Sequence, residues 1–238
     1  MLDPVLNLFF PPLCQICRER RASAAQGYVC GDCWSGVRFI APPFCHRCGL
    51  PYDGEIIGDF QCENCKDLDF AFSSARSAVR ANALILDVIH RYKYNAALWF
   101  EPFLADLLLR QALPVLRAEK WDCIVPVPLH ATKLREREFN QAARLAARLG
   151  AAAGLRVDES LVARLKPTNT QTALSRPERA ANVADAFEFC GGERLRGQRV
   201  VLFDDVLTTG ATTDACARAL LKGGAGEVCV WTLARAQS

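Results

Sequence analysis

The sequence predicts an α/β fold in which helices flank a mostly parallel sheet, with a small cysteine-rich domain ahead of it. Three observations support this class. Short apolar segments alternate with amphipathic ones beyond residue 70, one apolar segment runs into two aspartates and a threonine-rich loop, and eight cysteines lie before residue 66. We therefore expect a cysteine-rich domain over residues 1–70 and an α/β domain over residues 71–238.

The composition is that of a globular protein. Of 238 residues, 51% are hydrophobic and 23% are charged, which allows a sizeable core. No apolar run reaches the roughly 18 residues of a membrane span, and the apolar N-terminal patch lacks the basic start of a secretory signal. We expect a cytoplasmic protein without a membrane span. Residues 71–238 carry 23 Lys/Arg against 17 Asp/Glu, a balance modestly suited to a polyanion, although such charge also suits a solvated surface.

The cysteine-rich segment has the spacing of metal sites. Its cysteines form four C-x-x-C pairs: Cys14/Cys17, Cys30/Cys33, Cys45/Cys48 and Cys62/Cys65. Two such turns complete a tetrahedral Zn²⁺ site, and the segment has few large apolar residues to form a core without metal. Disulfides are disfavoured without a signal peptide, and a redox motif would not recur four times. We predict two structural zinc ions, with sequential pairing favoured over a cross-braced arrangement. The other cysteines are expected in the core: Cys123, Cys190, Cys216 and Cys229.

Beyond residue 70 the apolar periodicity predicts the elements of the sheet domain. Helices are expected at 82–94, 99–117, 139–150 and 212–222, and strands at 121–127, 200–203 and 227–233. The helix at 139–150 should bury Ala142, Ala146 and Leu149 and leave Gln141 on its exposed face.

The stretch VVLFDDVLTTGATTD, residues 200–214, points to a phosphorylated sugar. Ligands of parallel sheets bind beyond the carboxyl ends of strands, and a helix N-terminus presents backbone N–H groups that suit a phosphate. Gly210 lets the backbone approach a ligand, and the threonines add hydroxyl donors. The carboxylates of Asp204 and Asp205 would repel a phosphate, so sugar hydroxyls are their natural partners. The alternative is an ordinary strand-to-helix turn with capping Thr and Asp residues.

This stretch closely resembles the phosphoribosyl-pyrophosphate (PRPP) motif of type I phosphoribosyltransferases. The resemblance extends to the ComF family (ComFC/GntX-like) and covers essentially the whole chain. It is carried by the four C-x-x-C pairs, which match the family's double zinc ribbon, and by four further blocks: VPVPLH (125–130), REFNQA (137–142), RPERAANVADAF (176–187) and VWTLAR (230–235). The implied fold is a type I phosphoribosyltransferase-like domain behind a double zinc ribbon.

The resemblance also implies roles for individual residues. The 5′-phosphate of PRPP would bind Thr208, Thr209, Gly210, Ala211 and Thr212, and the ribose hydroxyls would bind Asp204 and Asp205. The pyrophosphate would lie near His130, Lys133, Arg135 and Arg137, in a basic loop after VPVP. Arg179, with Gln171, falls in the segment that forms a mobile lid in such enzymes and would join the two aspartates as a catalytic residue. Lys93 is a weaker candidate, and Mg²⁺ is implied with the pyrophosphate.

Two positions depart from the family pattern. Glu138 follows Arg137 where glycine is usual, which is electrostatically awkward near pyrophosphate and strained if the position needs a positive φ. Asn95 stands where glycine is common, a milder change because asparagine tolerates the left-handed region.

Two hypotheses for function follow. In the first, an enzyme displaces pyrophosphate from C1′ of PRPP by a nitrogen nucleophile of unknown identity, by positioning and charge stabilisation. In the second, the chain is a non-catalytic module of the transformation machinery that binds PRPP and single-stranded DNA. For both hypotheses the resemblance to the ComF family implies a link to DNA uptake in natural transformation, with competence proteins as partners. Stacking residues for DNA would be Trp34, Phe39, Phe44 and Tyr52, which also suit the small cores of the ribbons.

Overall fold

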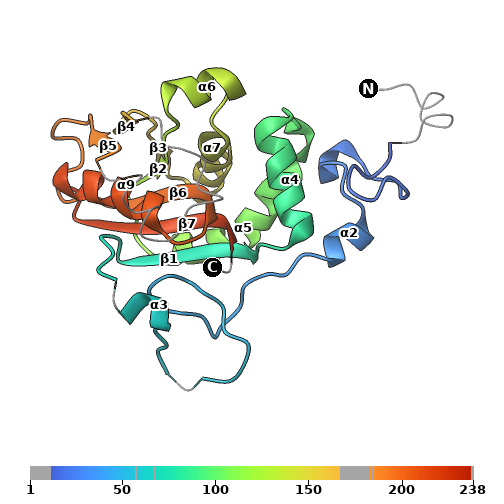
Figure 1. Ribbon diagram of the computed structural model, residues 1–238, viewed down its shortest axis with the longest axis horizontal. Coiled ribbons are helices and arrows are strands. Elements are labelled where there is room, and N and C mark those ends of the chain that lie inside the picture. The colour runs from blue at the N-terminus through green and yellow to red at the C-terminus, as the bar shows by residue number, and fades with distance from the viewer. Residues whose placement is uncertain (1–11, 57, 67, 167–182, 184, 237–238) are drawn as a thin grey trace.

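The computed structural model describes residues 12–56, 58–66, 68–166, 183 and 185–236. Its centre is a five-stranded sheet in the order β1-β7-β6-β2-β3 (Figure 1), and all four pairings are parallel. The strands are β1 (Ser74–Arg80), β2 (Cys123–Pro126), β3 (Arg156–Val157), β6 (Arg199–Leu207) and β7 (Glu227–Arg235). The predicted parallel α/β class is confirmed, and β1 and β3 are additions to the predicted strands.

Strand β6 is longer than its apolar run. The expected segment Val200–Phe203 is fully buried, but the strand continues to Leu207 because β7 pairs with it over the whole length, with Asp204 opposite Thr232. The prediction that the aspartates follow the strand was therefore wrong. Both lie inside it, held by the ladder to β7.

Helices cover both faces of the sheet (Figure 1). Residues Val201 and Phe203 of β6 face a cluster formed by α4 (Ala83–Tyr94), α5 (Glu101–Ala118) and α7 (Gln141–Ala153). Val200 and Leu202 face α9 (Ala211–Lys222) on the other side. A small two-stranded antiparallel sheet, β4 (Val162–Arg164) and β5 (Phe187–Phe189), packs beside α9, and the short 3-10 helix η2 (Leu98–Phe100) leads into α5. This alternation of buried faces is what a two-sided parallel sheet requires.

The helix ends follow capping chemistry. Asn82 accepts a hydrogen bond from the Ile85 N–H at 3.0 Å at the start of α4, and Asn140 accepts one from the Ala142 N–H at 3.0 Å at the start of α7. The cap places the start of α7 at Gln141. We expected Gln141 to be exposed, but it is buried. Its side-chain oxygen accepts a hydrogen bond from Arg137 at 3.0 Å, which satisfies this polar group away from water.

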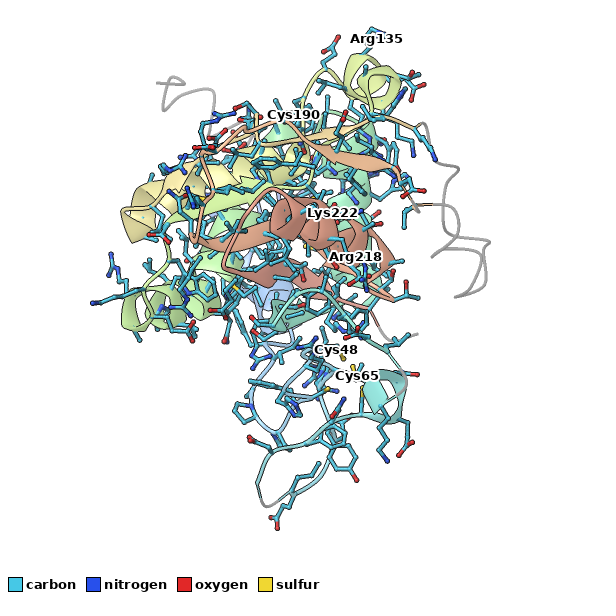
Figure 2. All side chains as sticks on the ribbon, turned by 90° about the vertical axis from the view of Figure 1, so that its left-hand side faces the viewer. Cys48, Cys65, Arg135, Cys190, Arg218 and Lys222 are labelled. Atoms are coloured by element: carbon cyan, nitrogen blue, oxygen red, sulfur yellow. The ribbon has the colours of Figure 1, made fainter. Side chains whose placement is uncertain are left out.

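Two other expectations need correction. The stretch after VPVP is not a loop: residues Ala131–Arg137 form the short helix α6. Among the four cysteines expected in the core, Cys123, Cys216 and Cys229 are buried but Cys190 is exposed at the end of β5 (Figure 2). Within the described part of the chain, no helix is both long and apolar enough to cross a membrane.

The cysteine-rich segment forms two separate units, which we call ribbon 1 (residues 12–36) and ribbon 2 (residues 43–66). Ribbon 1 contains the 3-10 helix η1 (Ala24–Gln26) and α2 (Gly31–Ser35), and ribbon 2 contains α3 (Glu63–Lys66). Figure 1 shows ribbon 1 beside α4 and ribbon 2 below β1. Each ribbon therefore contacts a different part of the sheet domain.

Candidate phosphate and sugar site and two metal centres

Each ribbon brings four cysteines together. Cys14, Cys17, Cys30 and Cys33 form one quartet and Cys45, Cys48, Cys62 and Cys65 the other, and within each the sulfur atoms all lie within 4.8 Å of one another. This is sequential pairing, as favoured from the sequence. The Sγ–Sγ separations include 3.8 Å for Cys14–Cys33 and 3.6 Å for Cys48–Cys62. Four thiolates at about 2.3 Å from a tetrahedral Zn²⁺ lie about 3.8 Å apart, so both quartets fit structural zinc.

The candidate ligand site lies where the sheet connections diverge. From β2 the chain passes through α7 to β3 on one side, and from β6 it passes through α9 to β7 on the other. Such a divergence leaves a crevice at the carboxyl ends of the two strands, where ligands of open α/β sheets bind. Pro126 at the end of β2 pairs with Phe203, so the two aspartates extend just beyond the end of β2.

The two aspartates differ in charge state. Asp205 is 4% exposed and forms an ion pair with Lys93 from the end of α4. Burial acts to raise its pKa, but the Lys93 ammonium outweighs burial and the pKa of Asp205 is lowered. Burial and then the Asp205 carboxylate raise the pKa of Asp204 to about 8. At neutral pH the pair thus carries one negative charge, and Lys93 balances it.

The loop after β6 leads directly into the N-terminus of α9. Gly210 has φ +85°, a left-handed conformation, and a Cβ there would lie 3.1 Å from the ring of Phe70. Glycine is therefore required by backbone shape and packing as well as by any ligand. The first hydrogen bond of the α-helical pattern in α9 runs from the Asp214 N–H to the Gly210 carbonyl at 2.8 Å. The N–H groups of residues 211–213 come before this bond, as the first N–H groups of any helix do. The Ala211 N–H makes only a long 3.4 Å contact to Thr209 Oγ1, and Thr208, Ala211 and Thr212 are partly exposed.

A cluster of cations faces the carboxylates. Arg137 donates to the Tyr94 hydroxyl at 2.8 Å and lies over the Tyr94 ring, and its charge also lowers the pKa of Asp205. Burial, with the guanidinium groups of Arg164 and Arg137 nearby, lowers the pKa of Lys133. Burial lowers the pKa of Arg164 as well, and Asp204 partly offsets that effect. Arg164 therefore lies within electrostatic range of Asp204 and Arg137 within range of Asp205, and Lys133 lies within range of both arginines.

The remaining predicted site residues do not join this cluster in the part of the chain that the structure describes. The ring nitrogen Nδ1 of His130 accepts the Thr132 N–H at 3.3 Å and so caps α6. Arg135 lies within α6 between Lys133 and Arg137, but it is exposed at the edge of the molecule (Figure 2), whereas those two residues are partly buried. Arg179 and Gln171 lie outside the described residues.

The departures from the family pattern are visible in the backbone. Glu138 has φ +65° and ends α6 in the left-handed region, so the positive φ expected there is present. Asn95 has φ −113°, and the positive φ falls on the next residue, Ala96, at +48°. Asn95 therefore does not use the left-handed region that asparagine tolerates.

Sequence reasoning ranked Lys93 low and did not single out Arg164. Lys93 was visible only as part of a short motif at the end of a helix, and its partner Asp205 lies 112 positions later in the chain. Arg164 belongs to a three-residue strand with no periodic signal. Only the tertiary fold brings these residues to the crevice.

Comparison with known proteins decides the family. The chain is 30% identical over 234 residues to Competence protein F of Haemophilus influenzae, covering 96% of this chain and 99% of that protein. It is 31% identical over 231 residues to the DNA utilization protein YhgH of Salmonella typhi, with the same coverage. The chain belongs to the ComF family. Residues 5–67 also match the Double zinc ribbon domain family.

A more distant ComF relative and one solved structure complete the comparison. Competence protein ComFC of Bacillus subtilis is 27% identical over 215 residues, covering 87% of this chain and 84% of that protein. Glutamine PRPP amidotransferase from B. subtilis is 20% identical with a TM-score of 0.36; the match covers 54% of this ComF chain and spans about a quarter of the amidotransferase. That score is too low to add to what the sheet topology shows.

Proposed function

We propose that this ComF protein binds a 5-phosphoribosyl group, with PRPP as its ligand, and acts in the handling of DNA that its relatives' names describe. One observation carries the proposal. A helix N-terminal loop suited to phosphate, a carboxyl pair suited to ribose hydroxyls, and a cluster of cations suited to pyrophosphate meet at the crevice between β2 and β6. A plain strand-to-helix turn would need neither the buried acid pair nor the cations.

The charge states support a polyanionic ligand. Asp204 is largely protonated at neutral pH and Asp205 is balanced by Lys93, so the two carboxyl groups and Lys93 together add no net charge to the crevice. Lys133, Arg137 and Arg164 then dominate the local potential. Ribose hydroxyls can exchange hydrogen bonds with Asp204, the more exposed of the pair, beside the negative charge of Asp205, while residues 208–212 receive the phosphate.

The acid pair also fits a magnesium ion that arrives with the ligand. Mg²⁺ takes oxygen ligands and is commonly held by one or two carboxylates together with substrate phosphates. Asp204, the more exposed of the two, is the carboxyl that would contribute, since Asp205 is engaged with Lys93. Bound there, the ion would neutralise charge on the pyrophosphate leaving group.

The proposed reaction is displacement of pyrophosphate from C1′ by a nitrogen nucleophile. The second candidate is a module that binds PRPP and single-stranded DNA without catalysis. It is favoured by Tyr94, a residue that is 55% exposed beside Arg137 and so suits stacking with a base. By contrast, the rings of Trp34 and Phe39 lie 5.6 Å apart and pack against the helical core of the sheet domain, which supports a core role for these two aromatics.

Calorimetry with PRPP, ribose 5-phosphate and inorganic phosphate tests the binding proposal. The double variant Asp204→Asn/Asp205→Asn should bind PRPP about 5- to 150-fold more weakly, because charged acceptors hold hydroxyls better than amides do. It should bind inorganic phosphate, which has no ribose, as well as the parent does. If the variant binds PRPP like the parent, the carboxyl pair is structural. Release of pyrophosphate from PRPP and Mg²⁺ in the presence of a panel of bases separates the enzyme from the binding module.

A further inference from the structure

Arg235 joins a zinc ligand to the phosphate loop. It lies at the end of β7 and is 4% exposed. Its Nη1 donates to the carbonyl of Thr208 at 2.6 Å and to that of Leu207 at 3.1 Å, and its Nη2 donates to Cys48 Sγ at 3.8 Å. One guanidinium group therefore spans from the metal centre of ribbon 2 to the first residues of the loop.

These bonds fix the direction of the loop amides. In a trans peptide the C=O of one residue and the N–H of the next point in opposite directions. Because the Thr208 carbonyl points at Arg235, the Thr209 N–H points away from it. By the same relation, the bond from Arg235 to the Leu207 carbonyl sets the direction of the Thr208 N–H. Arg235 thus orients donors without touching the ligand, as a positioning residue does.

A second set of contacts connects ribbon 2 to the same loop. Arg47, inside the Cys45/Cys48 turn, donates to the carbonyls of Phe70 and Ser73. The Phe70 ring packs against Gly210, and the next residue, Ala71, donates its N–H to Asp214 Oδ1 at 2.6 Å. The segment that leaves ribbon 2 therefore forms the surface on which the loop and the first turn of α9 rest.

Ribbon 2 itself is seated on β1. The Ala75 N–H donates to the Arg47 carbonyl at 2.8 Å, and a Cβ on Gly49 would lie 2.6 Å from the Ala75 carbonyl oxygen. Figure 2 shows Cys48 and Cys65 close together in the lobe below α9, which Arg218 and Lys222 mark. The quartet is thus fixed against the sheet on one side and against Arg235 on the other.

Ribbon 1 makes its contacts elsewhere. Arg91 of α4 donates to the Gln15 carbonyl at 2.6 Å, Asn82 donates to the Gly36 carbonyl at 3.1 Å, and Gly27 packs against Phe103 of α5. These contacts hold ribbon 1 to the helical face, so it provides a matched control with the same kind of metal centre.

We infer that ribbon 2 is the positioning element of the phosphate loop, and that zinc in its quartet acts on the loop through Arg235. The inference rests on the proposed function for its ligand, a phosphate group. A metal fixes Cys48, the sulfur that anchors Arg235, and groups that orient the direct ligands of a site commonly affect its affinity strongly. Zinc in ribbon 1 has no such path among the contacts described above.

Three variants of the full-length, zinc-loaded protein test this inference. Cys65→Ser and Cys33→Ser each change the last cysteine of a quartet, in α3 and α2, and each should lose one zinc ion by elemental analysis. Cys65→Ser should weaken inorganic phosphate by about 10-fold or more, and Cys33→Ser by no more than about 2-fold. Arg235→Lys should keep both zinc ions and weaken phosphate by about 5-fold, because an ammonium cannot reproduce the planar set of donors.

Hydrogen exchange of the backbone amides measures the local stability of the loop in the ligand-free protein. The amides of residues 208–212 should exchange faster in Cys65→Ser and Arg235→Lys than in the parent, and at the parent rate in Cys33→Ser. Equal exchange in all four proteins would overturn the inference, as would an Arg235→Lys protein that retains zinc and parental phosphate affinity. If the parent binds no phosphate but the exchange differences are present, the proposed function fails while the positioning of the loop by ribbon 2 stands.

Discussion

Replacing Asp204 by asparagine should make the ligand-free protein more stable, and increasingly so as pH rises. The pKa of Asp204 is raised to about 8 in the folded protein, against about 3.9 in an unfolded chain. Between these two values the unfolded chain has lost the proton that the folded protein still holds. The contribution of this carboxyl group to stability is therefore lost as pH rises from about 4 to about 8. Asparagine has the same shape and, like the protonated acid, can donate a hydrogen bond.

The magnitude follows from the shift. Between about pH 4 and pH 8 the parent should lose up to about 1.4 kcal/mol of unfolding free energy per pH unit relative to Asp204→Asn, giving an upper limit of about 4 kcal/mol at pH 7. Asp205→Asn is the matched control. The pKa of Asp205 is lowered, so its contribution is present above about pH 4, and removing it leaves Lys93 without its carboxylate. That variant should be less stable than the parent at pH 7.

Urea denaturation at a series of pH values from 5 to 9 measures both differences. The expected result is a difference between Asp204→Asn and the parent that grows with pH and levels off above about 8. A difference that is the same at pH 5 and pH 8 would refute the assignment of a neutral Asp204, and with it the charge balance proposed for the crevice.

Four further outcomes are expected. Protein purified without added metal should contain two Zn²⁺ per chain, and Cys45→Ser should lose one and keep the other; a zinc content near zero in folded protein would contradict the metal sites. Lys133→Met and Arg137→Met should each weaken PRPP more than ribose 5-phosphate in calorimetry, and equal losses would exclude them from the pyrophosphate site. Glu138→Gly should raise the unfolding free energy by about 0.5–1 kcal/mol, because relief of a left-handed backbone outweighs the greater entropy of glycine in the unfolded chain. It should also tighten PRPP, and unchanged PRPP affinity would mean that the side chain points away from the ligand. Gly210→Val should destabilise the protein and weaken phosphate, since it combines a left-handed backbone with a contact to Phe70, and retained phosphate binding would argue against the loop as the phosphate site.

Much of the fold was predictable because its signals are local. The apolar runs of β2, β6 and β7 and the amphipathic helices α4, α5, α7 and α9 are visible in short windows of sequence. Strand β1 was not, since its sequence SARSAVR mixes small and charged residues. Its two arginines have a structural use that periodicity cannot reveal: Arg76 donates to the His46 carbonyl and Arg80 pairs with Asp53, both in ribbon 2.

The candidate site was predictable only in part. The loop and the aspartates lie in one continuous motif, so their proximity follows from the chain itself. The cations arrive from separate elements, Lys93 from α4, Lys133 from α6 and Arg164 from β4, and no local pattern links them. The same is true of Arg235, whose role depends on the end of β7 lying between Cys48 and Thr208.

The charge balance explains why two aspartates can lie beside a phosphate loop. A pair of ionised carboxylates would repel a phosphate ester, and burying both would be costly. The fold avoids this by pairing Asp205 with Lys93 and by keeping Asp204 protonated at neutral pH. The cations of α6 and β4 then give the crevice a positive potential, which would attract a phosphorylated ligand. Once a ribose and a cation are bound, Asp204 gains partners that favour its ionised form, so the same carboxyl can be neutral while a polyanion enters and charged when it holds the sugar.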